Sequence, residues 1–243
     1  MKVFAKSDIG KARETNQDSY YVSLPNNNVG LFILADGMGG YNGGEIASKL
    51  AIVSAKNYIE SNFSSIEHNK ETILKLISDA IEYANMIVFE KSKEDKELEG
   101  MGTTIEITLI YNNRAYIGHI GDSRVYRIRK NIIRKLTTDH SYVQKLVKEG
   151  KITKEEAVSH PKKNMLTKAL GCTPFVEADL MVRGFLKDDI IVMTSDGLTN
   201  MVSDIDIYNT IINNTENCAN KLIDMANEAG GLDNITTVIV INN

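Results

Sequence analysis

The sequence predicts an α+β fold in which two antiparallel β-sheets pack as a sandwich with helices on both outer faces (αββα). Short apolar runs with a period of two and long segments with helical periodicity come in blocks along the chain. Asparagine-containing turns separate several of the strand-like runs. Strands and helices do not alternate one by one, as they would in a parallel βαβ sheet, so the block order favours antiparallel sheets.

The first part of the chain predicts three strands and two helices. Residues 2–6, 19–23 and the strongly apolar 29–35 have the composition of strands. Pro25 and the three asparagines that follow it predict a hairpin turn between the last two. Apolar residues then recur at spacings of three and four, which predicts helices over about residues 44–61 and 73–88, each with one face on a core.

The middle of the chain predicts an antiparallel meander. The period changes to two, and tight turns are expected at Asn112-Asn113 and Lys130-Asn131. The strands expected in this meander are residues 103–109, 116–120, 124–128 and 132–136.

A charged segment with helical character, residues 141–165, interrupts the strands. We interpret it as a flap inserted into a single domain that spans residues 1–243. Strands return at residues 180–184 and Ile190–Thr194, and residues 236–241 form a last strand. The helix expected before that strand carries four apolar residues at helical spacing, Ala219, Leu222, Ile223 and Ala226.

Composition narrows the class of protein. A hydrophobic content of 42% is ample for a core, and the net charge of −4 disfavours binding to a nucleic-acid backbone. Cys172 and Cys218 have no spacing typical of a zinc site or a disulfide framework. The first ten residues lack the apolar core of a signal peptide, and no apolar run reaches the roughly 18 residues of a membrane span. We expect a cytoplasmic monomer with no nucleic-acid or membrane partner.

The most informative residues are five aspartates next to predicted strands: Asp18, Asp36, Asp122, Asp196 and Asp233. Carboxylates at strand ends converge on one rim of a sheet, where they repel one another unless cations lie between them. Mg²⁺ and Mn²⁺ prefer oxygen ligands and keep several waters. An Asp-Gly pair alone is most often a turn, but five aspartates in this arrangement favour a hydrolytic site with two cations.

Other polar residues have plain structural interpretations. Arg124 is expected to form a salt bridge from its strand, His119 to pack within a strand, and His140 to cap a helix or stand in a turn. The lysines of residues 141–165 are typical of a solvated face. They also fit a mobile element that contacts a phosphorylated protein.

Motifs over the whole chain, in a fixed order, resemble those of the type 2C (PPM-type) metal-dependent serine/threonine protein phosphatases, in particular their compact bacterial members. The motifs are Ser7-Asp8-Ile9-Gly10, Asn16-Gln17-Asp18, Ala35-Asp36-Gly37-Met38-Gly39-Gly40, Met101-Gly102-Thr103-Thr104, Gly121-Asp122-Ser123-Arg124, Asp139-His140-Ser141, Ser195-Asp196-Gly197 and Asp233-Asn234-Ile235-Thr236.

The resemblance implies hydrolysis of phosphoserine and phosphothreonine in proteins by a water that bridges two Mn²⁺ or Mg²⁺ ions. It implies that Asp36 bridges both ions and that the Gly37 carbonyl completes one coordination shell. Asp196 and Asp233 would bind the other ion, and Asp18 would hold metal-bound waters.

The resemblance also implies a weaker third ion at Asp122 and Asp196, and an arginine, Arg13, that grips the phosphate. A planar guanidinium suits two phosphate oxygens better than an ammonium does. The implied partners are phosphorylated proteins, including a bacterial serine/threonine kinase and its substrates. Where many relatives carry a histidine in the metal loop this chain has Tyr41, so Tyr41 or a metal-bound water is expected to protonate the leaving group.

Three other functions fit the sequence less well. A non-catalytic binding module with the same fold is expected to lack one or more of Asp36, Asp196 and Asp233, and all three are present. A phosphohydrolase with an aspartate nucleophile needs an alternating parallel sheet and an Asp-x-Asp motif after the first strand. A metal-dependent nuclease is disfavoured by the acidic balance of charge.

Overall fold

The computed structural model describes residues 1–23, 29–39, 43–94 and 96–243, which form eleven named strands, seven α-helices and three short 3₁₀ helices. The strands are β1 (Lys2–Asp8), β2 (Asp18–Val22), β3 (Val29–Met38), β4 (Gly102–Thr103), β5 (Ile105–Tyr111), β6 (Arg114–Ile120), β7 (Arg124–Arg129), β8 (Ile132–Lys135), β9 (Asp179–Gly184), β10 (Ile190–Thr194) and β11 (Ile235–Ile241). The helices are α1 (Gly43–Asn62), α2 (Lys70–Glu94), α3 (Tyr142–Lys148), α4 (Lys154–Val158), α5 (Asp196–Thr199), α6 (Asp204–Asn213) and α7 (Cys218–Glu228), and the 3₁₀ helices are Phe63–Ser65, Lys96–Leu98 and Thr215–Asn217.

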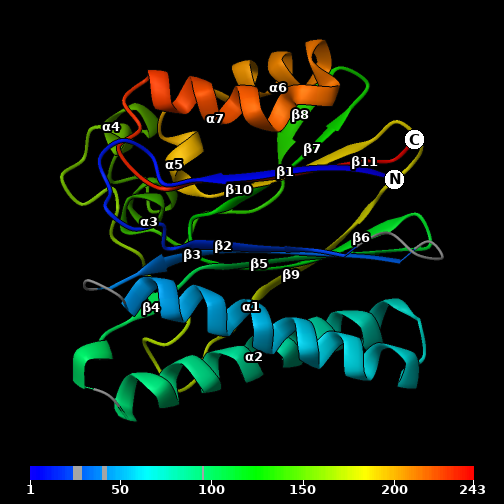
Figure 1. The fold of residues 1–243 in the computed structure, drawn as a ribbon, viewed down its shortest axis with the longest axis vertical. Coiled ribbons are helices and arrows are strands. Elements are labelled where there is room, and N and C mark those ends of the chain that lie inside the picture. Colours follow the sequence, from blue (N-terminus) through cyan, green and yellow to red (C-terminus); the bar gives the residue numbers. More distant parts are fainter. Residues whose placement is uncertain (24–28, 40–42, 95) are drawn as a thin grey trace.

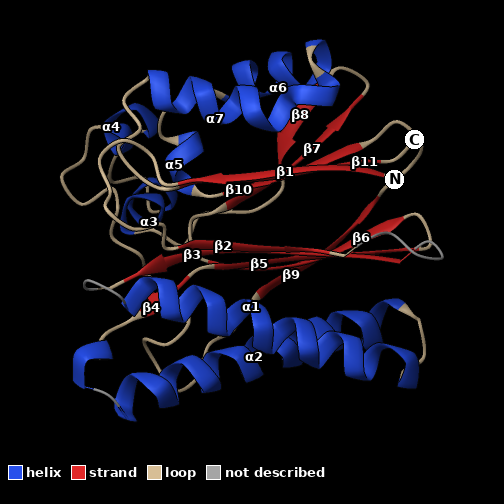
Figure 2. Ribbon diagram, in the orientation of Figure 1, coloured by secondary structure: helices blue, strands red, loops and turns tan. Residues whose placement is uncertain are grey.

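Two antiparallel sheets face each other, and helices cover both outer faces (Figures 1 and 2), which confirms the predicted sandwich. One sheet has the strand order β1-β11-β10-β7-β8 and lies under α6 and α7. The other has the order β2-β3-β5-β6-β9, with β4 paired to β3, and is covered by α1 and α2. The short helices α3, α4 and α5 gather at one end of the sandwich, and both termini lie at the other end (Figure 1).

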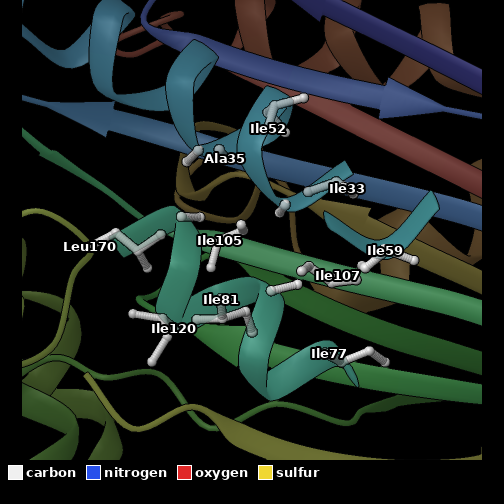
Figure 3. Packing of buried hydrophobic residues seen from close by; sticks show 14 of the residues in the cluster. Ile33, Ala35, Ile52, Ile59, Ile77, Ile81, Ile105, Ile107, Ile120 and Leu170 are labelled. Carbon is white, nitrogen blue, oxygen red and sulfur yellow. The ribbon is translucent and has the colours of Figure 1, made fainter. Parts of the chain in front are cut away.

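Apolar side chains fill both the space between the sheets and the space under each helical layer. Ile77 and Ile81 of α2 pack so closely on β6 that a Cβ on Gly118 would lie 2.5 Å from the Ile77 side chain. Figure 3 shows these two isoleucines beside Ile105 and Ile107 of β5. Each such side chain stabilises the fold by about 1.5–3 kcal/mol when fully buried.

The predicted meander is wrong at one point. Strands β5 and β6 pair, and β7 and β8 pair, but β6 and β7 belong to different sheets. The chain crosses between the sheets after Ile120, where Gly121 has a φ of 116° that favours glycine. A period of two shows that both segments are strands, but it does not say which sheet each one joins.

The predicted tight turns are confirmed, because Asn112 and Asn113 have φ values of 47° and 56°, and Lys130 and Asn131 have values of 47° and 63°. Positive φ at both central residues suits the twist of a two-residue hairpin. Strands β2 and β3 pair as antiparallel neighbours. The hairpin turn predicted between them, residues 24–28, lies outside the described residues.

Helix α6 was not predicted. Few features of the sequence mark this helix. Ser203 caps the first turn by accepting a hydrogen bond from the Asp206 N–H, and Ile207 and Ile211 are the buried aliphatic residues of the helix. Four polar or charged residues among its first seven interrupt the apolar pattern, which hides the helix from a search by periodicity.

The predicted flap segment contains α3 and α4, and its two ends meet. The Tyr142 N–H donates to the Met165 carbonyl over 2.7 Å, and Ser141 forms an isolated bridge with Leu166. Ser141 caps α3, and Thr153 caps α4 in a reciprocal capping box with Glu156. None of the described helices is both long enough and apolar enough to cross a membrane.

Candidate functional site

A cavity of about 190 Å³ lies at the end of the sandwich where α5 begins. Its walls bring together six residues that the sequence singled out, although they are far apart along the chain. These are Arg13, Asp36, Gly37, Asp122, Asp196 and Asp233. The seventh, Asp18, lies across from Asp36 in the register of β2 and β3.

The five aspartates come from both sheets. Asp18 is the first residue of β2, and Asp36 lies within β3 instead of after its end, because that strand continues to Met38. Asp122 stands in the link between the two sheets. Asp196 begins α5 directly after β10, and Asp233 precedes β11 by two residues.

Two glycines let backbone segments meet beside these aspartates. A Cβ on Gly37 would lie 2.0 Å from the Gly44 carbonyl oxygen, and one on Gly197 would lie 2.0 Å from the Asn234 carbonyl oxygen. Both distances are far below van der Waals contact, so only glycine fits at these positions. The glycines that follow Asp36 and Asp196 therefore allow close packing of the segments that carry these two carboxylates.

The carboxylates repel one another. Burial, followed by the charges of Asp18 and Asp196, raises the pKa of Asp36 well above its usual range. Burial and Asp196 do the same to the pKa of Asp122. The pKa of Asp196 rises to about 6 through burial and the charge of Asp233, and burial raises that of Asp18 to about 7. The protein alone does not supply enough positive charge here to keep every carboxylate ionised.

Asp18 has an unused hydrogen-bond acceptor. Its Oδ2 accepts a hydrogen bond from Ser195 Oγ over 2.7 Å, which ties β2 to the other sheet. Its Oδ1 is buried and has no hydrogen-bond partner in the described residues. A buried carboxylate oxygen without a donor is costly, so this atom fits a site in which a bound water donates to it.

Arg13 lies at the mouth of the cavity and donates from Nη2 to Asp233 Oδ2 over 2.8 Å. That hydrogen bond raises the pKa of Arg13, and 53% of its side chain remains exposed. The loop before it is held in place because the N–H groups of Lys11 and Ala12 both donate to the Gly231 carbonyl. An exposed guanidinium beside a carboxylate cluster is placed to receive an anion.

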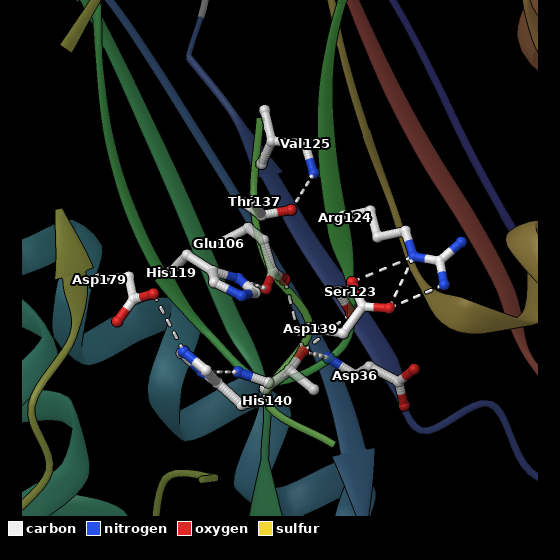
Figure 4. A network of polar contacts seen from close by, with 12 residues as sticks. Asp36, Glu106, His119, Ser123, Arg124, Val125, Thr137, Asp139, His140 and Asp179 are labelled. Carbon is white, nitrogen blue, oxygen red and sulfur yellow. Dashed lines mark hydrogen bonds and ion pairs between the residues drawn. The ribbon is translucent and has the colours of Figure 1, made fainter. Parts of the chain in front are cut away.

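A buried polar network lies behind Asp36 (Figure 4). The Asp36 N–H donates to Thr104 Oγ1 over 3.0 Å, and the Thr104 N–H donates to the Asp36 carbonyl over 2.9 Å. Glu106 Oε1 lies 3.0 Å from His119 Nδ1, and both side chains are fully buried. His119 Nε2 contacts the Thr138 carbonyl at 3.0 Å, so His119 is the packed strand residue that the sequence predicted.

Burial favours the neutral forms of this pair, because it raises the pKa of Glu106 well above its usual range and lowers the pKa of His119. We infer that the protonated carboxyl of Glu106 donates to His119 Nδ1. The Nε2–H tautomer of His119 then donates to the Thr138 carbonyl. Every proton in the pair then has an acceptor.

Arg124 forms the predicted salt bridge, since its Nη2 lies 2.8 Å from Asp139 Oδ2. Burial alone would raise the pKa of Asp139, but Arg124 and Lys135 hold it below its usual range. His140 accepts a hydrogen bond from the Gly121 N–H at Nδ1, over 3.1 Å, and stands in the loop before α3. The cap of α3 is Ser141, so the cap interpretation of His140 is wrong.

Several residues at the site had no role in the sequence analysis. Thr104, Ser195 and Asn234 lie inside motifs that carry the resemblance, and their hydrogen bonds position Asp36, Asp18 and the loop before Asp18. Glu106 falls at a polar position of the alternating strand predicted over residues 103–109. The sequence feature that could have revealed the buried role of Glu106 is a carboxylate with apolar residues on both sides in a strand. Tyr41 lies outside the described residues.

Four of the five carboxylates line the same cavity, those of Asp36, Asp122, Asp196 and Asp233. In the part of the chain that the structure describes, no three Cys, His, Asp or Glu side chains are close enough to form a closed metal cage. Mg²⁺ and Mn²⁺ are usually held by a few carboxylates together with several waters, so they do not need a closed cage of protein ligands.

Comparison with known proteins agrees with this geometry. The protein phosphatase 2C family matches residues 10–228. The chain is 36% identical to the protein phosphatase PhpP of Streptococcus pneumoniae, over 100% of this chain and 98% of that protein. The serine/threonine phosphatase of S. agalactiae has the same fold, with a TM-score of 0.91, 38% identity and coverage of 100% and 99% of the two chains.

A third relative is the catalytic domain of the serine/threonine protein phosphatase PstP, whose structure was solved with two manganese ions. Its TM-score is 0.84 at 34% identity, over 98% of this chain and 96% of that one. The chain therefore belongs to the protein phosphatase 2C family of serine/threonine protein phosphatases.

Proposed function

We propose that this protein removes phosphate from phosphoserine and phosphothreonine of proteins with two divalent cations held by Asp36, the Gly37 carbonyl, Asp196 and Asp233. The observation that carries the proposal is the cavity where these groups meet beside Arg13. Membership of the protein phosphatase 2C family and the two manganese ions of the PstP structure support it.

The residues present fit divalent cations of this kind. All the side-chain donors are carboxylate oxygens, which Mg²⁺ and Mn²⁺ prefer. Burial and mutual repulsion raise the pKa values of Asp36 and Asp196, so a cation between them would relieve an unfavourable charge. The unpartnered Oδ1 of Asp18 fits a water bound to such a cation. A weaker third ion at Asp122 and Asp196 would follow from the same charges.

When bound, the cations would lower the pKa of the attacking water and neutralise charge on the phosphoryl oxygens. The chain's own residues do the rest. Arg13 would exchange its ion pair with Asp233 for two hydrogen bonds to the phosphate. Asp18 would orient the attacking water through its free oxygen. Thr104 holds the backbone of Asp36 from both sides, so the segment that carries this carboxylate is positioned before substrate binds.

The substrates we propose are phosphorylated proteins, including the products of a serine/threonine kinase. The flap, residues 141–165, would contact these proteins, because Asn164 lines the cavity and α3 and α4 stand beside it. Protonation of the leaving group would fall to Tyr41 or to a metal-bound water.

Phosphate release from a phosphothreonine peptide tests this function. We expect release with Mn²⁺ and none with a chelator. A folded protein that releases no phosphate with either Mn²⁺ or Mg²⁺ would favour the non-catalytic binding module instead.

Substitution of Arg13 separates phosphate binding from folding. In Arg13→Ala we expect kcat/KM for the peptide to fall about a hundredfold, because a charge-assisted, two-point contact with the phosphate is lost. Arg13→Lys should recover only part of the loss, since an ammonium lacks the planar fork. Steady-state kinetics checks both, and equal activity of Arg13→Ala and wild type would exclude the phosphate-binding role.

Stability should depend on pH more strongly without cations than with them. The folded-state pKa values of Asp196 (about 6) and Asp18 (about 7) exceed the unfolded value of about 3.9. The folded protein therefore binds more protons, and its free energy of unfolding falls as pH rises from about 4 to 7. Saturating Mg²⁺ should reduce this fall, because cations take the place of protons. Melting temperatures across this range, with chelator and with Mg²⁺, check the prediction, and a flat profile in chelator would contradict it.

A further inference from the structure

The arginines of this chain are not spread evenly. Lysine and arginine together number 28, and only seven are arginine. Arg13 and Arg124 stand at the catalytic end of the sandwich. The remaining five lie in strands β6 to β9, namely Arg114, Arg127, Arg129, Arg134 and Arg183. Since lysine serves for most exposed positive charge in this protein, arginine at these positions suggests a need for its planar fork.

Two of these arginines occupy β7 positions that face the other sheet. Val125 belongs to the apolar cluster between the sheets, and Arg127 and Arg129 follow it at intervals of two. Both donate across the gap to the Gly184 carbonyl of β9, over 3.3 Å and 3.0 Å. The inward face of β7 thus changes from apolar to cationic along the strand.

Arg134 and Arg183 complete the group, which we term the arginine cluster (Arg127, Arg129, Arg134 and Arg183). Arg134 is the register partner of Arg127 on the edge strand β8, so the two like charges stand directly opposite each other. Arg183 follows Met181 by two residues on the edge strand β9, and Met181 packs against the cluster between the sheets. The arginine cluster therefore lies where the edges of the two sheets face each other.

The arginine cluster is short of negative charge. Asp189 pairs with Arg129, with 2.7 Å between Arg129 Nε and Asp189 Oδ1. No ion pair of Arg127, Arg134 or Arg183 is present within the described residues. The Nε of Arg127 is buried without an acceptor, and burial together with Arg129 lowers the pKa of this guanidinium. Like charges opposite each other and a buried donor without a partner are both unfavourable unless an anion binds.

We propose that the arginine cluster binds a second phosphate group on the same protein substrate whose other phosphate occupies the catalytic cavity. The inference rests on the proposed function, and it assigns the enzyme a preference for multiply phosphorylated segments. Guanidinium groups that converge from different strands suit a doubly charged phosphate better than a single carboxylate.

The two sites lie along the same strand. Arg124 is the first residue of β7, at the catalytic end, and Arg129 is the last. At roughly 3.3 Å per residue, the two ends of the strand are about 17 Å apart. An extended peptide spans that distance with roughly five to seven residues. The expected substrate therefore carries two phosphates about that many residues apart.

Peptides with one hydrolysable phosphothreonine test the proposal. A second position six residues away carries a phosphonate analogue of phosphothreonine, glutamate or threonine. For wild type we expect the phosphonate to lower KM about tenfold relative to threonine, with a smaller effect of glutamate and unchanged kcat. Arg134 and Arg183 are both exposed. In the variants Arg134→Thr and Arg183→Thr, the lower KM for the phosphonate peptide should disappear.

Arg114→Thr is the matched control. Arg114 lies on the neighbouring strand β6, but the inward positions of β6 are Ala115 and Ile117, so Arg114 lies on the opposite face. The Arg114→Thr variant removes the same charge, and the tenfold lower KM for the phosphonate peptide should persist in this variant. Loss of the advantage in Arg114→Thr as well would show a non-specific charge effect and overturn the proposal, as would equal KM values for all three peptides.

Two further measurements separate this proposal from the proposed function. Hydrolysis of p-nitrophenyl phosphate needs only the catalytic cavity, so its rate should be the same in wild type and all three variants. If wild type hydrolyses no substrate, the proposed function fails. Fluorescence anisotropy of the doubly modified peptide in chelator then still tests the arginine cluster. Weaker binding to Arg134→Thr and Arg183→Thr than to Arg114→Thr supports it, and equal binding refutes it.

Discussion

An Asp36→Asn enzyme is expected to release phosphate from a phosphothreonine peptide about a thousandfold more slowly than wild type. Asp36 lies inside β3 at the wall of the cavity, and the charges of Asp18, Asp196, Asp122 and Asp233 all act on it. An amide removes the charge that would hold two cations while keeping the shape of the side chain. Single-turnover and steady-state rates with saturating Mn²⁺ measure the loss.

The same variant should fold at least as well as wild type when no cation is present. Neutralising one buried carboxylate relieves repulsion, so its melting temperature in chelator should not fall. Asp79→Asn on α2, where the carboxylate pairs with Lys75 at the surface, is the control and should keep full activity. Near-normal turnover by Asp36→Asn would mean that the cations, if bound, do not depend on this residue.

Glu106→Ala should be the most destabilising of the single changes considered, with a loss of about 3 kcal/mol in the free energy of unfolding. The change leaves buried His119 Nδ1 without its partner, removes a hydrogen bond from Thr104 and opens a cavity between the sheets. Glu106→Gln should cost less, because its amide can still donate to Nδ1. Urea unfolding monitored by circular dichroism checks both values.

Glu82→Ala provides the comparison for Glu106→Ala, because Glu82 is exposed on α2. Its effect on the free energy of unfolding should stay within about 0.5 kcal/mol. If Glu106→Ala were no more harmful than Glu82→Ala, the buried network would contribute little to stability. The buried network could then not be said to hold Asp36 in place by stabilising the fold.

The layers of the fold and the residues of the candidate site could be predicted from patterns along the chain alone. Apolar periodicity located the long helices and most of the strands, because each has one face on a core. The aspartates stood out because they flank apolar strands and two of them precede glycine. The cavity does bring Asp36, Asp122, Asp196 and Asp233 together.

What the sequence could not supply depends on contacts between distant segments. The crossing at Gly121 separates β6 from β7, and only the pairing of β6 with β9 shows it. Glu106 gains its importance from His119, a residue that reaches it through strand pairing. Arg127 and Arg134 are ordinary strand residues until the register places them opposite each other.

The candidate site is divided between the two sheets, with Asp18 and Asp36 in one and Asp196 and Asp233 attached to the other. Neither half alone can hold the full set of carboxylates. Activity therefore reports on the docking of the sheets, which is a contact between segments far apart in the chain and so a slow event in folding. During refolding from urea, catalytic activity should recover after the far-ultraviolet signal of the strands and helices.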